Sequence, residues 1–194
     1  MRLGRIAAVC LAISTFCVQG KAESFVLFPK AERLVSPDGR FEVRDAGRPG
    51  AATDFVGSFH SLWLTDLKNG NARKLCDYMG IAAVAWSGND FLVITQYVGK
   101  KTSRALVFAT SGAQDPFMLD KSTMIQLLPV EMREALRGND HVFVEASRLE
   151  NDRFYFRVWG YGQHDPNGFG WKCQYELRAG KVNCGGAGET TFQH

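Results

Sequence analysis

A tight turn leads directly into a strand at Ser36-Pro37-Asp38-Gly39-Arg40-Phe41-Glu42-Val43, and two later stretches of the chain repeat this pattern. Proline presets φ and glycine accepts positive φ, so Pro-Asp-Gly favours a turn, while the alternation after it is typical of a half-buried strand. The related stretches are residues 87–93 and 150–156. Aligning the three copies places Phe41, Phe91 and Phe154 at equivalent positions, which predicts three copies of one structural unit.

Each copy continues into a second strand and another turn, so the repeated unit is predicted to be an antiparallel meander of three or four strands. The second strands are expected at residues 62–66, 105–109 and 174–177, and strands are also expected before two of the turns, at 81–86 and 141–149. The chain is therefore predicted to be all-β. One short inserted helix is expected at 129–137, because Pro129 suits a first helical turn and Gly138 suits a helix end.

The Ser-Pro-Asp-Gly-Arg-Phe turn and the Ala-Trp-Ser-Gly-Asn-Asp turn resemble the blade motif of β-propeller repeats. Such repeats occur in the periplasmic Tol-system propeller and in the propellers of prolyl oligopeptidases. The resemblance implies a small β-propeller-like fold of three to four meanders, and it carries no peptidase activity because no part of that catalytic domain is visible. Propellers normally close with at least four blades. Either residues 25–28 help to complete a fourth sheet, or the fold stays open as a β-sandwich.

The first 22 residues have the pattern of a signal peptide. Arg2 and Arg5 precede a mostly apolar run from Ile6 to Val18, and Gly20-Lys21-Ala22 places small residues where a signal peptidase cuts. The apolar run is too short to span a bilayer. We therefore expect residues 1–22 to be removed, residues 23–194 to form a single domain, and the protein to be periplasmic or secreted.

Removing the leader also removes the apparent basic character of the chain. Three of the 23 basic residues lie in the leader, which leaves 20 basic side chains against 20 acidic ones. Nucleic acids and anionic membranes require a surplus of positive charge. The sequence therefore predicts neither a nucleic-acid partner nor insertion into a membrane.

Three cysteines remain after the leader, and export would place them in an oxidising compartment. Cys173 and Cys184 flank a segment that alternates like two strands around the turn at residues 178–181. A hairpin brings such residues opposite each other, at a separation that a disulfide can bridge. We predict a Cys173–Cys184 disulfide and a buried, reduced Cys76.

The most unusual segment is the glycine-rich and aromatic stretch from residue 160 to residue 171. It joins two predicted strands with more residues than a turn requires, and long connections of this kind are often functional. We expect it to be a partner-binding loop, unless its aromatic rings fold back onto the core. Its candidate contact residues are Tyr161, Gln163, His164, Asp165, Asn167, Phe169 and Trp171.

No catalytic residue, metal site or cofactor is predicted. The histidines do not stand at metal-ligand spacing, and the chain contains no Gly-x-Ser-x-Gly or phosphate-cradling motif. Asp165 and Asn167 raise a calcium loop as an option, but Phe169 stands where a further oxygen ligand would be needed. The basic turn at residues 100–104 is expected to be a solvated hairpin tip or a rim for an acidic partner.

The sequence is consistent with two candidate functions. A small, neutral, exported domain without a catalytic motif fits a non-catalytic module that binds another protein. By analogy of class, it is similar to periplasmic immunity or inhibitor proteins that block a secreted toxin or a cell-wall-degrading hydrolase. The alternative is a small envelope hydrolase or carbohydrate-binding protein with its site at the mouth of the propeller.

Overall fold

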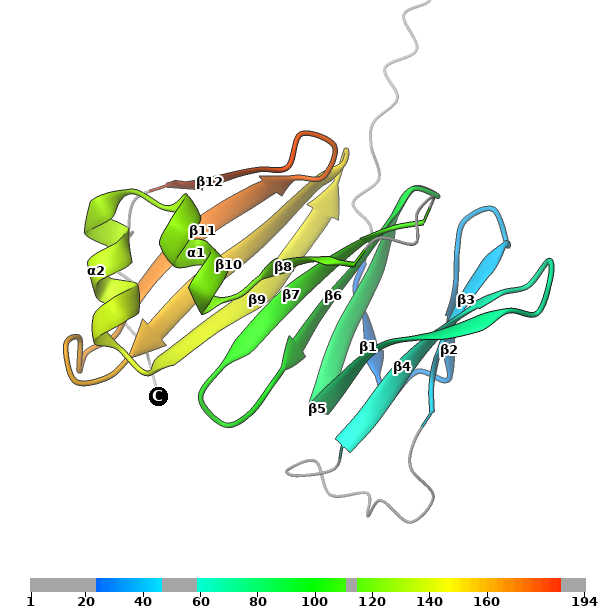
Figure 1. Ribbon diagram of the computed structural model, residues 1–194, viewed down its shortest axis with the longest axis horizontal. Coiled ribbons are helices and arrows are strands. Elements are labelled where there is room, and N and C mark those ends of the chain that lie inside the picture. The colour runs from blue at the N-terminus through cyan, green and yellow to red at the C-terminus, as the bar shows by residue number, and fades with distance from the viewer. Residues whose placement is uncertain (1–23, 47–58, 111–114, 186–194) are drawn as a thin grey trace, which may run out of the picture.

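Antiparallel strands make up most of the chain in the computed structural model, which describes residues 24–46, 59–110 and 115–185 (Figure 1). This confirms the predicted all-β class. The predicted signal peptide and the Ser111-Gly112 turn lie outside the described residues.

Three successive meanders form the body of the molecule, as the sequence repeat predicts. The first consists of β2 (Arg33–Val35), β3 (Phe41–Asp45), β4 (Phe59–Asp66) and the first half of β5 (Ala72–Ser87). The second consists of the rest of β5, β6 (Phe91–Tyr97), β7 (Ser103–Ala109) and β8 (Phe117–Leu119). The third consists of β9 (His141–Glu150), β10 (Arg153–Tyr161), β11 (Phe169–Glu176) and β12 (Lys181–Gly185).

Strand β5 joins the first two meanders into one eight-stranded sheet, whereas the third meander is a separate four-stranded sheet. The first part of β5 pairs with β4 and its second part pairs with β6, with a register shift in the β5–β6 pairing between Met79 and Ala82. The short strand β1 (Val26–Phe28) pairs with β5 as well. Residues 25–28 therefore do not begin a fourth sheet, and neither described sheet closes into a ring.

Two short helices connect β8 to β9, where the sequence predicted one. Helix α2 (Val130–Gly138) matches the prediction, with Pro129 at its N-cap. Helix α1 (Lys121–Leu127) was not predicted, because Ser122 and Thr123 are weak helix formers. It is capped by Asp120, whose carboxylate accepts a hydrogen bond from the Thr123 backbone N–H at 2.8 Å. In the parts of the chain that the structure describes, no helix has the length and apolarity needed to cross a membrane.

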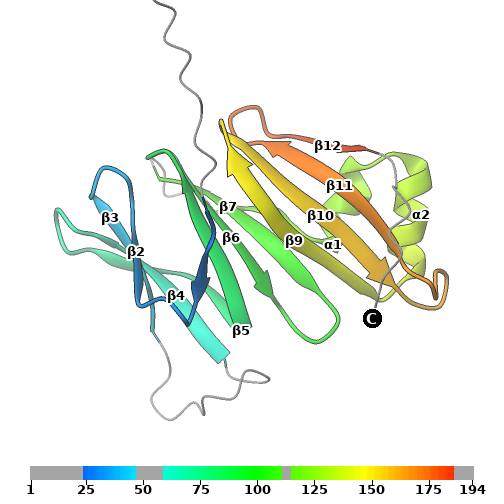
Figure 2. The same ribbon diagram turned by 180° about the vertical axis from the view of Figure 1, so that it is seen from behind.

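The apolar core lies between successive meanders. This core has two parts, one on each side of the middle meander. Residues of β6 alternate between them, since Leu92 and Ile94 pack toward the first meander and Val93 packs toward the third. Leu136 of α2 and Met124 of α1 complete the part beside the third meander. Both helices thus cover one face of β9–β12, and Figure 2 shows the opposite face of this sheet with the helices behind it.

The three repeated turns meet at one end of the molecule and bond to one another. The Asp38 N–H donates to Asn89 Oδ1 at 3.0 Å, which links the first turn to the second. Ser87 Oγ donates to Asp152 Oδ1 at 2.9 Å, which links the second to the third. Arg178 adds 2.6 Å hydrogen bonds to Asp152 and to Asp90. The repeat therefore has a direct structural role in holding the meanders in sequence.

The three aligned phenylalanines occupy the start of the second strand of each meander, as predicted. Phe41 and Phe154 are buried, whereas Phe91 is only partly buried against the core. The guanidinium of Arg178 lies 5.6 Å from the centroid of the Phe91 ring. A long basic side chain therefore packs beside this phenylalanine.

Cysteine pairing follows the prediction. Cys173 and Cys184 lie opposite each other on β11 and β12 and form a disulfide, with their Cα atoms 4.0 Å apart. Cys76 is a buried free thiol in the core. Burial raises the pKa of this thiol to about 12, so it is a poor nucleophile at neutral pH.

Candidate functional site

The glycine-rich segment is a shorter loop than the sequence predicted, because both flanking strands extend into it. Tyr161 ends β10 and Phe169 begins β11, which leaves residues 162–168 as the connection. Gly160 is a strand residue that must be small. A Cβ there would lie 2.3 Å from the His141 carbonyl oxygen and 2.7 Å from the Phe169 ring. The glycines thus reflect close packing as well as turn formation.

The tip of the loop is held by a buried asparagine. Asn139, which is 1% exposed, donates from Nδ2 to Asp165 Oδ2 at 2.6 Å and to the Ala135 carbonyl at 2.8 Å. Its Oδ1 accepts from the Asp165 backbone N–H at 3.0 Å. The Asp165 carboxylate, whose side chain is 31% exposed, therefore helps to position the loop.

The other predicted contact residues separate into surface and core positions. Gln163, His164 and Asn167 are exposed at the tip, and His164 Nδ1 lies 3.1 Å from Asp165 Oδ2. Phe169 is partly buried with its ring centroid 4.8 Å from that of Trp171. Trp171 is only 8% exposed and belongs to the core. Unlike the anchor that the sequence predicted, it has little surface to offer a partner, because its position on β11 faces inward.

A row of aromatic side chains begins beside the loop and continues along the sheet. On β10, Phe154, Phe156 and Val158 face the core, whereas the alternate residues lie on the opposite face of the sheet. We call this opposite side the outer face. The aromatic row consists of His141, Phe143, Trp159 and Tyr161 of this face, together with Tyr97 of β6. Phe143 is only 5% exposed. The rings are in contact: His141–Tyr161 at 4.4 Å, Phe143–Trp159 at 4.4 Å and Tyr97–Phe143 at 6.1 Å.

Guanidinium groups stack on aromatic rings along the same face. Arg157 lies 5.7 Å from the centroid of Trp159, and Arg148 lies 4.1 Å from that of Tyr155. Both distances are in the range of cation–π attraction. The outer face of β9 and β10 therefore carries both aromatic rings and planar cations.

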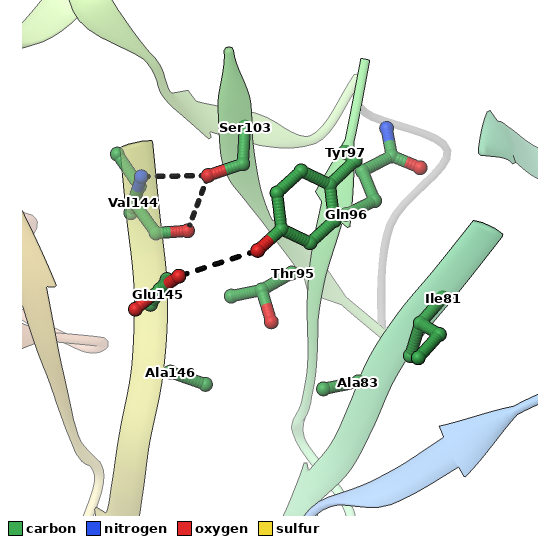
Figure 3. Close-up of a pocket in the computed structure, with 9 residues that line it drawn as sticks. All are labelled: Ile81, Ala83, Thr95, Gln96, Tyr97, Ser103, Val144, Glu145 and Ala146. Atoms are coloured by element: carbon green, nitrogen blue, oxygen red, sulfur yellow. Dashed lines mark hydrogen bonds between the residues drawn. The ribbon is translucent and has the colours of Figure 1, made fainter. Parts of the chain in front are cut away.

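A cleft of about 240 Å³ adjoins the aromatic row (Figure 3). Strand β9 forms one wall, and β5 and β6 form the other. Tyr97 stands at its edge and donates from Oη to Glu145 Oε1 at 3.3 Å. Burial, together with the Glu145 charge, raises the pKa of Tyr97. The lining residues are Ile81, Ala83, Thr95, Gln96, Tyr97, Ser103, Val144, Glu145 and Ala146.

Ser103 fixes the width of the cleft by joining β7 to β9. Its hydroxyl donates to the Val144 carbonyl at 2.9 Å and accepts from the Val144 N–H at 2.7 Å. Lys101, in the basic turn, pairs with Asp140 at 2.7 Å and lowers the pKa of that carboxyl to about 2. The basic turn therefore contacts the chain just before β9, and the ion pair with Asp140 partly neutralises the positive charge of the turn.

No local sequence pattern marks Tyr97, Phe143, Glu145 or Trp159 as site residues. They come from separate strands, and each has the ordinary pattern of a strand residue. The one available signal was the pairing of outward positions on β9 and β10, which requires knowing the register of the two strands.

A second polar cluster lies in the first meander. His60 Nδ1 is 3.1 Å from Asp45 Oδ2, and Tyr78 Oη donates to Asp45 Oδ1 at 3.0 Å. The Tyr78 ring also stacks on His60, with a centroid separation of 5.1 Å. These contacts tie β3, β4 and β5 together. Among residues 24–46, 59–110 and 115–185, no group of three or more His, Cys, Asp or Glu side chains could hold a metal ion.

No protein-family model matches the chain, and no curated protein or solved structure shows significant similarity to it.

Proposed function

We propose that this is an exported, non-catalytic protein-binding module, and that it acts as a periplasmic immunity or inhibitor protein against a secreted toxin or a cell-wall-degrading hydrolase. The observation that carries the proposal is the aromatic row on the outer face of the four-stranded sheet, which Tyr97 of β6 joins from the eight-stranded sheet. Tyr161 is 41% exposed and Tyr97 is 37% exposed, although most aromatic side chains of the described chain pack into the core.

Aromatic rings at such positions favour protein binding for two physical reasons. They bury a large apolar area with few rotatable bonds, and they prefer the desolvated centre of an interface. Here neighbouring rings and strand backbone already restrict them, so little additional entropy would be lost on binding. Tyr161 is further supported by the loop that Asn139 anchors.

The repeat and the disulfide support the wider proposal. Three meanders with interlocked turns are the arrangement expected of an open, propeller-like fold. The Cys173–Cys184 bridge suits a protein that works in an oxidising compartment, in agreement with the signal-peptide pattern. The partner class is an analogy with small envelope inhibitors, and it has to be tested by isolating the partner.

The test is a capture experiment followed by affinity measurements. Wild-type protein and a Trp159→Ala/Tyr161→Ala double variant serve as parallel baits in an envelope extract, and the protein retained by the wild type alone is purified. Truncating a central aromatic anchor commonly costs about 2 kcal/mol, so Tyr161→Ala should weaken binding about thirtyfold. Phe59→Ala is the matched control, since Phe59 is 56% exposed but lies on the first meander.

Thermal unfolding of each variant separates binding from folding. The proposal requires Tyr161→Ala to retain the wild-type melting temperature while losing affinity. Unchanged affinity in a folded Tyr161→Ala variant would remove the aromatic row from the interface.

One observation favours the second candidate, a carbohydrate-binding protein or hydrolase. Exposed rings beside the Glu145 carboxylate could stack on sugar rings and accept hydrogen bonds from hydroxyl groups. Titrating soluble cell-wall glycan fragments while following tryptophan fluorescence tests this candidate. Saturable binding that Tyr161→Ala abolishes, in a protein that captures no partner, would replace the inhibitor proposal.

A further inference from the structure

The cleft beside Tyr97 combines an apolar wall with two polar groups that the fold does not fully use. Ala83 and Ala146 face each other across it, and their small side chains leave the space open (Figure 3). A volume of about 240 Å³ corresponds to about eight water molecules at about 30 Å³ each. That space can admit one long side chain.

Thr95 is the first of these polar groups. Its side chain lies between the two walls of the cleft, and the residue is only 7% exposed (Figure 3). The described residues offer its hydroxyl no hydrogen-bond partner. That hydroxyl is therefore available to a guest in the cleft, as a hydrogen-bond donor or acceptor.

Glu145 is the second. Within the described part of the chain, Tyr97 Oη is the only hydrogen-bond partner of its carboxylate, and no cation lies within ion-pair distance of it. The nearby guanidinium of Arg157 is directed away from the cleft, since its Nε and Nη2 atoms pack over Gly170 of β11. The Gln96 side chain also points away from the cleft (Figure 3).

These groups restrict the chemistry of a guest. An anion would be repelled by Glu145, and a purely apolar group would leave the Thr95 hydroxyl without a partner and the Glu145 carboxylate without a counter-charge. A cation on an apolar stem matches both kinds of lining residue. The stem would contact Ile81, Ala83 and Ala146, and the cationic head would bond to Glu145 and Thr95.

We propose that this cleft binds an alkylammonium or guanidinium group. Resting on the proposed protein-binding function, the natural source is a lysine or arginine side chain of the partner, inserted beside the aromatic row. Tyr97 belongs to both surfaces, so the two form one continuous interface: the row supplies apolar contact area, and the cleft selects a basic residue.

The experiment uses small probes, so it needs no partner. The disulfide-bonded protein is titrated with Nα-acetyl-lysine-N-methylamide and with its uncharged norleucine counterpart, while amide chemical shifts are followed by NMR. The lysine probe should shift the signals of Glu145 and Ala146 and bind at least tenfold more tightly than the norleucine probe. Equal binding of the two probes would overturn the proposal.

Variants locate the effect. Glu145→Gln and Thr95→Val should each weaken lysine binding, the first at least tenfold. Glu150→Gln should leave it unchanged, because Glu150 lies on the same strand but pairs with Arg148. Wild-type affinity in a folded Glu145→Gln variant would also overturn the proposal.

A third probe, n-butylamine, identifies the source of the cation. Weaker binding of n-butylamine than of the blocked lysine indicates a peptide-borne side chain, whereas equal binding indicates a free amine; both outcomes support the cationic site. If the lysine probe fails while Tyr161→Ala still weakens partner binding, the cleft proposal falls and the proposed function stands.

Discussion

Asn139 shows how much of the candidate site depends on a single side chain. It lies after helix α2, yet it supplies three hydrogen bonds that join the helix end to the tip of the 162–168 loop. Lys121 adds a fourth contact by donating to the Asn139 carbonyl at 2.6 Å. The two helices therefore serve the loop as well as the core.

Replacing Asn139 by alanine should lower the free energy of unfolding by about 1–3 kcal/mol, because buried partners would lose their hydrogen bonds. The measurement is chemical denaturation of the disulfide-bonded protein. Asn167→Ala serves as the control, since Asn167 is exposed on the same loop and its replacement should change stability by less than about 0.5 kcal/mol. Equal stability of the two variants would show that Asn139 does not anchor the loop.

Individual residues divide into those that local sequence can identify and those that it cannot. Tyr161 was predictable because it stands in an unusual glycine-rich context. Trp171 shares that context, but the strand extends past it and turns it inward, so composition alone gives the wrong environment. Tyr97 and Glu145 meet across two sheets, and no local pattern records a contact between residues so far apart in sequence.

Strand β10 illustrates the element scale. Its alternation places a core on one side and the aromatic row on the other, and the pairing Gly160↔Val142 brings the backbone of β9 close. The strands and the disulfide were predictable, because period-two alternation and cysteine spacing are local signals. Helix α1 was not, since its cap at Asp120 outweighs the weak helix propensity of the residues that follow.

Gly160→Ala tests the packing of this element. The added methyl group would collide with the His141 carbonyl oxygen, which belongs to the backbone and cannot move away easily. We expect destabilisation of about 1–3 kcal/mol or more, measured by denaturant unfolding. Gly99→Ala is the matched control: nothing lies within 4 Å of its Cβ position, so stability should stay the same or rise slightly. A tolerated Gly160→Ala would mean that β9 and β10 are farther apart than described.

The described chain is a series of three successive meanders. The middle meander is covered on both faces, because each neighbour buries one of them. One face of the third meander packs into the core, and the other face carries the aromatic row. The repeat predicted three to four meanders, of which the described chain has three. It could not predict whether the ring closes, because closure depends on contacts between the first and last units rather than on the repeat itself.

Amide hydrogen exchange of the protein, alone and bound to the captured partner, tests the binding surface most directly. The account predicts slower exchange on binding in residues 97–103, 141–145 and 159–168, which surround the aromatic row and the cleft. Exchange in residues 59–79 of the first meander should stay unchanged. Slower exchange confined to the first meander, with none around Tyr161 and Glu145, would contradict it.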